Sequence, residues 1–117
     1  MKILVVDDEK NILKLYKAEL EDEGYVVVTA NSGQEALEAF DREQPDLITL
    51  DIMMPEMDGI QVLRQIKQKS ADVPVIMLTA YDYRDDFSVW VSDAYVVKSS
   101  DLTQLKATIR QIAEKKQ

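Results

Sequence analysis

Short apolar runs alternate along this sequence with segments whose apolar residues repeat every three or four positions. The runs are rich in β-branched residues and almost continuous, which is typical of strands that are covered on both faces. They comprise Ile3–Val6, Tyr25–Thr29, Leu47–Leu50, Val75–Leu78 and Ala94–Val97. The pattern predicts five buried strands.

Helical periodicity fills the intervals between the first three runs. Apolar residues from Ile12 to Leu20 recur at helical spacing, and Gly24 can end this helix because glycine readily adopts the left-handed conformation of a C-terminal cap. Ser32 and Glu35 have the spacing of a capping box. A second helix is therefore expected to begin directly after Ser32.

Three further helices are expected. Asp58 can cap the first of them. The next, around Tyr83–Val91, lacks a clean apolar stripe and is expected to be short or irregular. The last has an apolar stripe that begins at Leu102, with Ser100 or Asp101 near its start. Strands that alternate with helices through short connections predict parallel strands, right-handed crossovers and a single three-layer α/β sandwich over residues 1–117.

Composition narrows the classes of function. The net charge is −8, from 22 acidic and 14 basic residues, which argues against direct nucleic-acid binding because that binding relies on Lys and Arg. The same charge disfavours an anionic membrane surface. The chain has no histidine and no cysteine, which excludes imidazole bases, thiol nucleophiles and metal sites built on either. No apolar run approaches the roughly 20 residues that span a bilayer, and a cytoplasmic location is expected.

Polar side chains follow the predicted strands along one edge. Asp7 and Asp8 come after the first strand and Asp51 after the third, while Thr79 ends the fourth and Lys98 follows the fifth. In an open parallel sheet, ligands bind at the carboxyl ends of the strands, near the point where the strand order reverses. These five residues form the candidate site.

The acidic residues of this edge have two interpretations. Like charges about 4 Å apart repel by about 1 kcal/mol in water and about 4 kcal/mol in a partly screened site, and a cation would remove that repulsion. Carboxylate, carbonyl and water oxygens suit Mg²⁺. Alternatively, Asp7 and Asp8 cap the first helix, since Asp is common at helix starts.

Asp51 stands at the end of a strand, before a loop that contains Pro55 and Gly59. A carboxylate in this position can attack phosphorus as a nucleophile and form an acyl phosphate. The Thr79 hydroxyl and the Lys98 ammonium would then stabilise phosphoryl oxygens. Each residue also has a plainer interpretation when taken alone: a turn aspartate, an ordinary strand threonine and a solvated lysine.

Four segments of the sequence resemble the receiver domains of two-component response regulators. In the central one, Asp51 is followed by Met-Pro and then Asp-Gly, and an acidic pair ends 43 residues upstream. The segments are Val5–Glu9, Asp46–Gly59, Pro74–Ala80 and Tyr95–Lys98. The resemblance covers essentially the whole chain. It implies a CheY-like, flavodoxin-like fold with strand order 2-1-3-4-5, and a receiver domain without an output domain over residues 1–117.

The resemblance also implies roles for the acidic residues. Asp51 would be the phosphoacceptor, in a reaction that needs Mg²⁺. Asp8 would ligate Mg²⁺ directly, together with Asp51 and the backbone carbonyl of Met53, and Asp7 would act through water. The donor would be a phosphohistidine of a sensor histidine kinase or a histidine phosphotransfer protein.

The resemblance also implies one contact residue and two switch residues, Thr79 and Tyr95. Lys98 would contact the carboxylate and phosphoryl oxygens, Thr79 would move toward the phosphoryl group, and Tyr95 would turn inward. The domain would then be a phosphorylation-dependent switch whose output is contact with a downstream protein. It would catalyse its own phosphorylation and dephosphorylation and have no separate small-molecule activity.

Some positions depart from the family pattern. Ser99 stands where a cis proline is common, and a cis bond without proline costs about 2.5–4 kcal/mol, so a trans Lys98–Ser99 bond is expected. The segment between Thr79 and Lys98 is shorter than usual, and its Trp90 is either a partner anchor or a core residue. Met53 and Tyr81 occupy the positions that tune hydrolysis of the acyl phosphate, and neither activates water well. Slow self-dephosphorylation is therefore expected.

Three alternatives remain. A pseudo-receiver that only docks proteins is favoured by Ser99 and by the altered fourth helix, but it is opposed by the complete set of Asp8, Asp51, Thr79 and Lys98. A flavin-binding protein of similar topology would need a first loop that cradles phosphate, whereas this loop is Asp7, Asp8 and Glu9. A haloacid-dehalogenase-like phosphatase would have an aspartate where Met53 stands.

Overall fold

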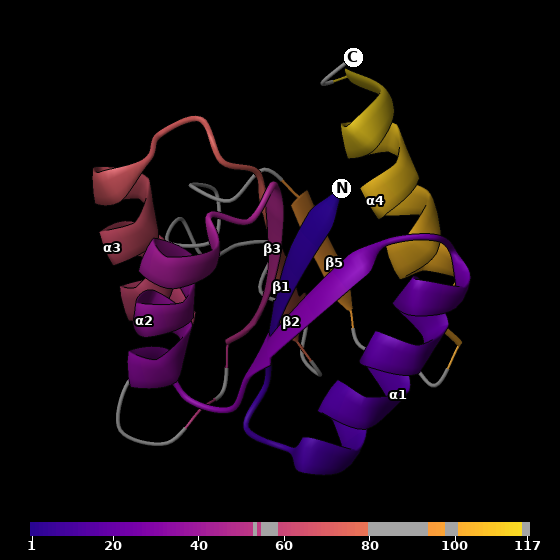
Figure 1. Cartoon of the computed structure of the whole chain (residues 1–117), viewed down its shortest axis with the longest axis horizontal. Coiled ribbons are helices and arrows are strands. Elements are labelled where there is room, and N and C mark those ends of the chain that lie inside the picture. The colour runs from indigo at the N-terminus through magenta and orange to yellow at the C-terminus, as the bar shows by residue number, and fades with distance from the viewer. Residues whose placement is uncertain (53, 55–58, 80–93, 98–100, 116–117) are drawn as a thin grey trace.

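Five parallel strands form the centre of the fold (Figure 1). The computed structural model describes residues 1–52, 54, 59–79, 94–97 and 101–115, with the backbone alone at Thr79 and Tyr95. The strands lie side by side in the order β2-β1-β3-β4-β5. They are β1 (Lys2–Val6), β2 (Val26–Ala30), β3 (Leu47–Asp51), β4 (Val75–Thr79) and β5 (Ala94–Val97). The predicted parallel sheet and its strand order are confirmed.

Helices in the described part of the chain cover both faces of this sheet. They are α1 (Lys10–Asp22), α2 (Gly33–Glu43), α3 (Gly59–Lys69) and α4 (Thr103–Lys115). In Figure 1, α2 and α3 lie on one side of the sheet and α1 and α4 on the other, which confirms the predicted three-layer arrangement. Among the described helices, none has the length and apolar character needed to cross a bilayer.

Some expectations lie outside the described residues. They concern the helix around Tyr83–Val91, the cap at Asp58 and the Lys98–Ser99 peptide bond. These three stay predictions. The other four expected helices are present.

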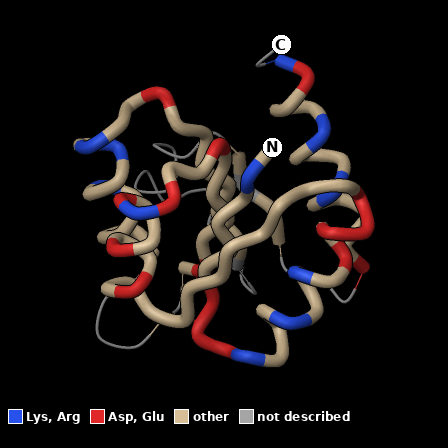
Figure 2. Tube along the Cα trace, in the orientation of Figure 1, with Lys and Arg blue, Asp and Glu red and all other residues tan. Residues whose placement is uncertain are grey.

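The sheet separates two hydrophobic clusters, because successive side chains of a strand point to opposite faces. In β1, Leu4 and Val6 pack in the cluster with residues of α2 and α3, whereas Ile3 and Val5 pack in the cluster with residues of α1 and α4. All five residues of β3 are buried, so a slip of one residue would exchange its two faces. Figure 2 shows that charged residues lie mainly on the helices and loops around the sheet. Burial therefore fixes the position of the central strand.

Gly24 ends α1 as predicted. Its φ is 94°, and the Tyr25 N–H donates to the Leu20 carbonyl at 3.3 Å, which is a bond of the Schellman motif. Because the helix end uses this N–H, β2 begins at Val26, one residue later than the apolar run indicates. The strand also extends one residue further, to Ala30, which pairs with β1.

Two other helix starts follow their sequence signals. The Ser32 hydroxyl accepts the Glu35 N–H at 3.1 Å, and the Glu35 carboxylate accepts the Asn31 N–H at 3.3 Å. At the start of α4, Asp101 Oδ1 accepts the Thr103 N–H at 2.9 Å. Hydrogen bonds from the hydroxyl and the N–H of Thr103 lower the pKa of the Asp101 carboxyl below its ordinary value.

Candidate functional site

The register of the central strands brings two predicted site residues together. Val6 of β1 pairs with Leu50 of β3, so the residues that follow them, Asp7 and Asp51, are neighbours at the carboxyl edge of the sheet. The ladder between β1 and β2 also reaches this edge, since the Asp7 N–H donates to the Ala30 carbonyl at 3.1 Å. Backbone pairing therefore places both carboxylates.

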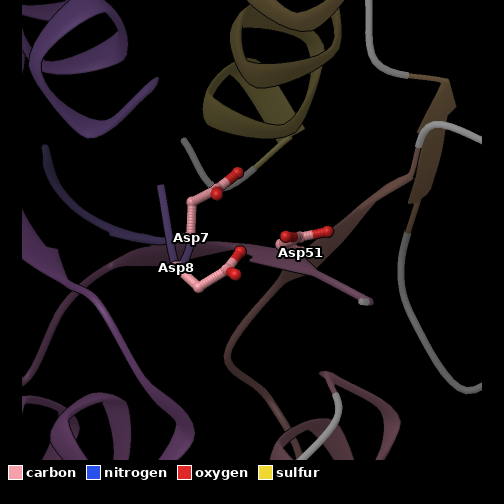
Figure 3. A group of neighbouring side chains, drawn as sticks. All are labelled: Asp7, Asp8 and Asp51. Atoms are coloured by element: carbon pink, nitrogen blue, oxygen red, sulfur yellow. The ribbon is translucent and has the colours of Figure 1, made fainter. Parts of the chain in front are cut away.

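Asp7, Asp8 and Asp51 form an acidic cluster (Figure 3). Each contributes a carboxylate oxygen, and these oxygens all lie within 4.8 Å of one another. Asp7 is 1% exposed and Asp51 is 3% exposed, whereas Asp8 is only partly buried. In Figure 3, Asp7 and Asp8 extend from the end of β1 and Asp51 from the neighbouring β3. The cluster thus combines two buried carboxylates with one that solvent can reach.

Asp7 bonds to the residue that caps α1, but neither Asp7 nor Asp8 is the N-cap that the alternative interpretation proposed. Asp7 Oδ1 accepts the Glu9 N–H at 2.9 Å. Glu9 is the N-cap residue of α1 and makes no side-chain cap bond of its own. The bond orients the Asp7 carboxylate beside Asp51, so the structural role and a role in the site are compatible.

The donor set of the cluster fits a hard cation. Three carboxylates this close repel one another, and the burial of Asp7 and Asp51 strengthens that repulsion. Mg²⁺ binds oxygen ligands, usually takes one or two carboxylates and keeps several of its waters. The cluster can supply one or two carboxylate ligands, and its solvent-accessible member lets the ion keep its waters.

The structure places the other predicted residues only in part. Thr79 ends β4 directly after Leu78, which pairs with Asp51, so the Thr79 backbone lies at the same edge. Within β5, Tyr95 pairs with Met77. The side chains of Thr79 and Tyr95 lie outside the described residues, as do the whole of Met53, Tyr81, Trp90 and Lys98.

Thr49 is a polar residue near the cluster that the sequence pattern did not single out. It is 0% exposed, and in the described part of the chain its Oγ1 has no hydrogen-bond partner. Thr49 lies two residues before Asp51, on the same face of β3, between Val5 and Ile76 of the adjoining strands. Because threonine is an ordinary strand residue, only the burial of its hydroxyl makes it unusual.

Comparison with known proteins identifies one family. Residues 3–110 match the response regulator receiver domain. The response regulator protein TrrA of Thermotoga maritima, solved in complex with Mg²⁺-BeF, has a TM-score of 0.91 and 48% identity, over 94% of this chain and 96% of that chain. TrrA has also been solved in complex with the histidine kinase ThkA, with a TM-score of 0.89 over the same shares at 48% identity.

The curated relatives are longer proteins. The alkaline phosphatase synthesis transcriptional regulatory protein PhoP of Bacillus subtilis is 42% identical over 114 residues, which are 95% of this chain and 48% of PhoP. The probable transcriptional regulator ycf27 of Guillardia theta is 46% identical over 114 residues, 95% of this chain and 44% of that protein. The chain spans about half the length of these relatives. As these are transcriptional regulators, they give no support to the expectation that the chain acts without nucleic acid.

Fold, site and similarity agree. The observed strand order is the one that the sequence resemblance implied, and the three acidic residues lie together at the carboxyl edge, where the order of strands and polar residues along the chain placed them. The family match covers residues 3–110 of the chain. The chain therefore belongs to the response regulator receiver domain family, the CheY-like domains of two-component signalling.

Proposed function

We propose that this domain is a signalling switch that accepts a phosphoryl group on Asp51. The acidic cluster carries the proposal, because the Asp51 carboxylate ends the central strand within 4.8 Å of the carboxylates of Asp7 and Asp8. The complex of TrrA with Mg²⁺-BeF supports it, since beryllium fluoride is a tetrahedral analogue of a phosphoryl group. A phosphorylation site is the function that best explains a buried nucleophile beside two further carboxylates.

The proposed reaction is a phosphoryl transfer between proteins. A carboxylate oxygen of Asp51 forms a bond to the phosphorus of a phosphohistidine, and the bond between phosphorus and the imidazole nitrogen breaks. The electron pair of the broken bond stays on the imidazole. Because β3 is paired with strands on both sides, the Asp51 carboxylate is held in position before the donor arrives.

The acidic cluster would hold the cation that this transfer needs. In the proposal, Asp8, Asp51 and the backbone carbonyl of Met53 are direct ligands of Mg²⁺, and Asp7 acts through water. The Asp7 bond to Glu9 supports this division, because that carboxylate already has a structural role. Bound Mg²⁺ would neutralise negative charge on the cluster and on the phosphoryl group.

Further residues would stabilise and report the phosphorylated state. Lys98 would place a positive charge, and Thr79 a hydroxyl donor, against phosphoryl oxygens. Thr79 and Tyr95 would then change position and bias an existing equilibrium between two states. Reversing such an equilibrium from 1:99 to 99:1 takes about 5.5 kcal/mol of differential interaction. Met53 and Tyr81 are proposed to make hydrolysis of the acyl phosphate slow.

The proposed partners follow from the same chemistry. The donor is a sensor histidine kinase or a histidine phosphotransfer protein, because this chain contains no histidine and TrrA forms a complex with the histidine kinase ThkA. Output passes to a downstream protein by contact, in the cytoplasm and without direct binding to nucleic acid or membrane. The domain catalyses only its own phosphorylation and dephosphorylation.

Intact-mass spectrometry tests the proposal. After incubation with Mg²⁺ and acetyl phosphate, the wild type is expected to gain one phosphoryl group and Asp51→Asn to gain none. Asp72→Asn is the matched control, since Asp72 is an exposed acid outside the cluster, and it should gain phosphate like the wild type. A wild type that gains no phosphate would favour the pseudo-receiver, and an Asp51→Asn variant that gains the same amount would place the acceptor elsewhere.

A further inference from the structure

The first residue of α3 lies against the backbone of Asp51. Gly59 is buried, and its N–H donates to the Ile52 carbonyl at 2.9 Å. A Cβ added to Gly59 would lie 2.1 Å from the carbonyl oxygen of Asp51 and 2.9 Å from its carbonyl carbon. Real Cβ atoms essentially never approach another atom within 3.0 Å. At this position, only glycine lets the helix begin in contact with the strand.

Both sides of this contact are anchored in the core. On the strand side, the Ile52 N–H donates to the Leu78 carbonyl of β4 at 3.1 Å, and the Ile52 side chain is 3% exposed. On the helix side, α3 is anchored in the same hydrophobic cluster by three residues that are 0% exposed, Val62, Leu63 and Ile66. A side chain at position 59 would therefore displace the Asp51–Ile52 peptide, not an exposed and flexible group.

We propose that Gly59 is a positioning residue for the phosphoacceptor. Because it lacks a side chain, α3 can press on the Asp51 peptide and hold the Asp51 carboxylate within the acidic cluster. Restoring a separation of 2.1 Å to the 3.4 Å of ordinary contact needs a shift of about 1.3 Å. Misplacing a reacting group by about 1 Å can slow a reaction by about 100-fold.

Gly59→Ala tests this role, with Gly24→Ala as the matched control. Gly24 has a φ of 94° and nothing within 4 Å of an added Cβ, so alanine strains the backbone there without a clash. Both variants are expected to lower the melting temperature. At a temperature where both are folded, Gly59→Ala should weaken Mg²⁺ binding about tenfold by calorimetry. It should also slow phosphorylation by acetyl phosphate about 100-fold, whereas Gly24→Ala should stay close to the wild type in both measurements.

The outcomes separate this inference from the proposed function. The expected effect on phosphorylation rests on the proposed function, whereas the expected effect on Mg²⁺ affinity does not. If the wild type gains no phosphate and Gly59→Ala still binds Mg²⁺ more weakly, the proposed function fails and the positioning role holds. If the wild type is phosphorylated and Gly59→Ala matches it in both rate and affinity, the positioning role is overturned.

A measurement on the wild type decides the question if Gly59→Ala does not fold. In a nuclear magnetic resonance titration with Mg²⁺, the amide resonances of Gly59 and Asp51 should shift with the same midpoint, because their backbones are in contact. The Gly24 amide, at the far end of α1, should not shift. A Gly59 resonance that stays fixed while that of Asp51 moves would overturn the inference.

Discussion

Replacing Asp8 by asparagine tests whether repulsion between the three carboxylates of the acidic cluster destabilises the folded domain. Asp8 is the only partly buried member of the cluster, so asparagine removes a charge without opening a cavity in the core. Two unit charges 4.8 Å apart repel by about 0.9 kcal/mol in water and about 3.5 kcal/mol at an effective dielectric of 20. Because solvent reaches Asp8, the lower figure applies to each of its two pairs. Without Mg²⁺, the free energy of unfolding of Asp8→Asn should therefore be about 2 kcal/mol higher than that of the wild type.

Urea unfolding with and without Mg²⁺ measures this difference. In EDTA, the midpoint of Asp8→Asn should rise while the slope of the transition stays the same. Added Mg²⁺ stabilises the folded state in proportion to the logarithm of its concentration over the dissociation constant. The wild type should gain more from Mg²⁺, since it has one more carboxylate, and the advantage of the variant should shrink or reverse. Physiological salt screens the repulsion only in part, because the Debye length of about 8 Å exceeds the separation of the charges.

A control variant separates the cluster from general charge effects. Asp72→Asn removes an exposed acid outside the cluster and should change stability by no more than about 0.5 kcal/mol in either condition. An Asp8→Asn variant that is less stable than the wild type in EDTA would show that Asp8 is not repelled by its two acidic neighbours. An Asp8→Asn variant that gains as much stability from Mg²⁺ as the wild type does would show that Asp8 does not contribute to the cation site.

Three further predictions concern single residues and the lifetime of the phosphorylated state. Thr49→Val replaces a buried hydroxyl with a methyl group of the same shape and should stabilise the domain by about 1 kcal/mol in urea unfolding; a loss of stability would mean that the hydroxyl is bonded. Asp101→Asn should reduce the loss of stability at acid pH. The ordinary pKa of this carboxyl is 3.8, and folding lowers it. The Asp101 carboxylate therefore contributes its full stabilisation above pH 3.8 and loses it as the pH falls through the lower pKa of the folded state. If the free energies of unfolding of the two proteins, plotted against pH, stay parallel down to about pH 3, this prediction is wrong. The phosphorylated domain should persist for minutes or longer without a phosphatase, and a half-life of seconds would contradict the role proposed for Met53 and Tyr81.

The strands and two of the helix ends were predictable from the sequence, because local signals and burial act in the same direction there. The apolar runs became strands because both faces of the sheet are covered, and Gly24 and Ser32 ended and began helices through bonds within a few residues of themselves. The acidic cluster was also predictable, because parallel strands place their carboxyl ends at one edge. Even the one-residue error at the start of β2 has a local cause, since the Tyr25 N–H closes α1.

What the sequence could not reveal depends on contacts between distant segments. Gly59 was interpreted as punctuation of a loop, because its approach to Asp51 arises only when α3 packs on the sheet. Thr49 has the sequence pattern of an ordinary strand residue. Its hydroxyl lowers the stability of the fold only when the neighbouring strands and helices exclude water. For Asp7 the sequence left two interpretations open, a helix cap or a site residue. In the structure, Asp7 accepts a hydrogen bond from the Glu9 N–H and also belongs to the acidic cluster.

Mapping the phosphorylated residue shows directly whether Asp51 is the phosphoacceptor. Borohydride reduces an aspartyl phosphate to homoserine, so peptide mass spectrometry of the domain after incubation with Mg²⁺ and acetyl phosphate, followed by reduction, identifies the acceptor. Homoserine is expected at position 51, with none at positions 7 or 8, and none anywhere when Mg²⁺ is chelated. Homoserine at another aspartate, or its absence from a fully folded wild type, would show that Asp51 is not the phosphoacceptor.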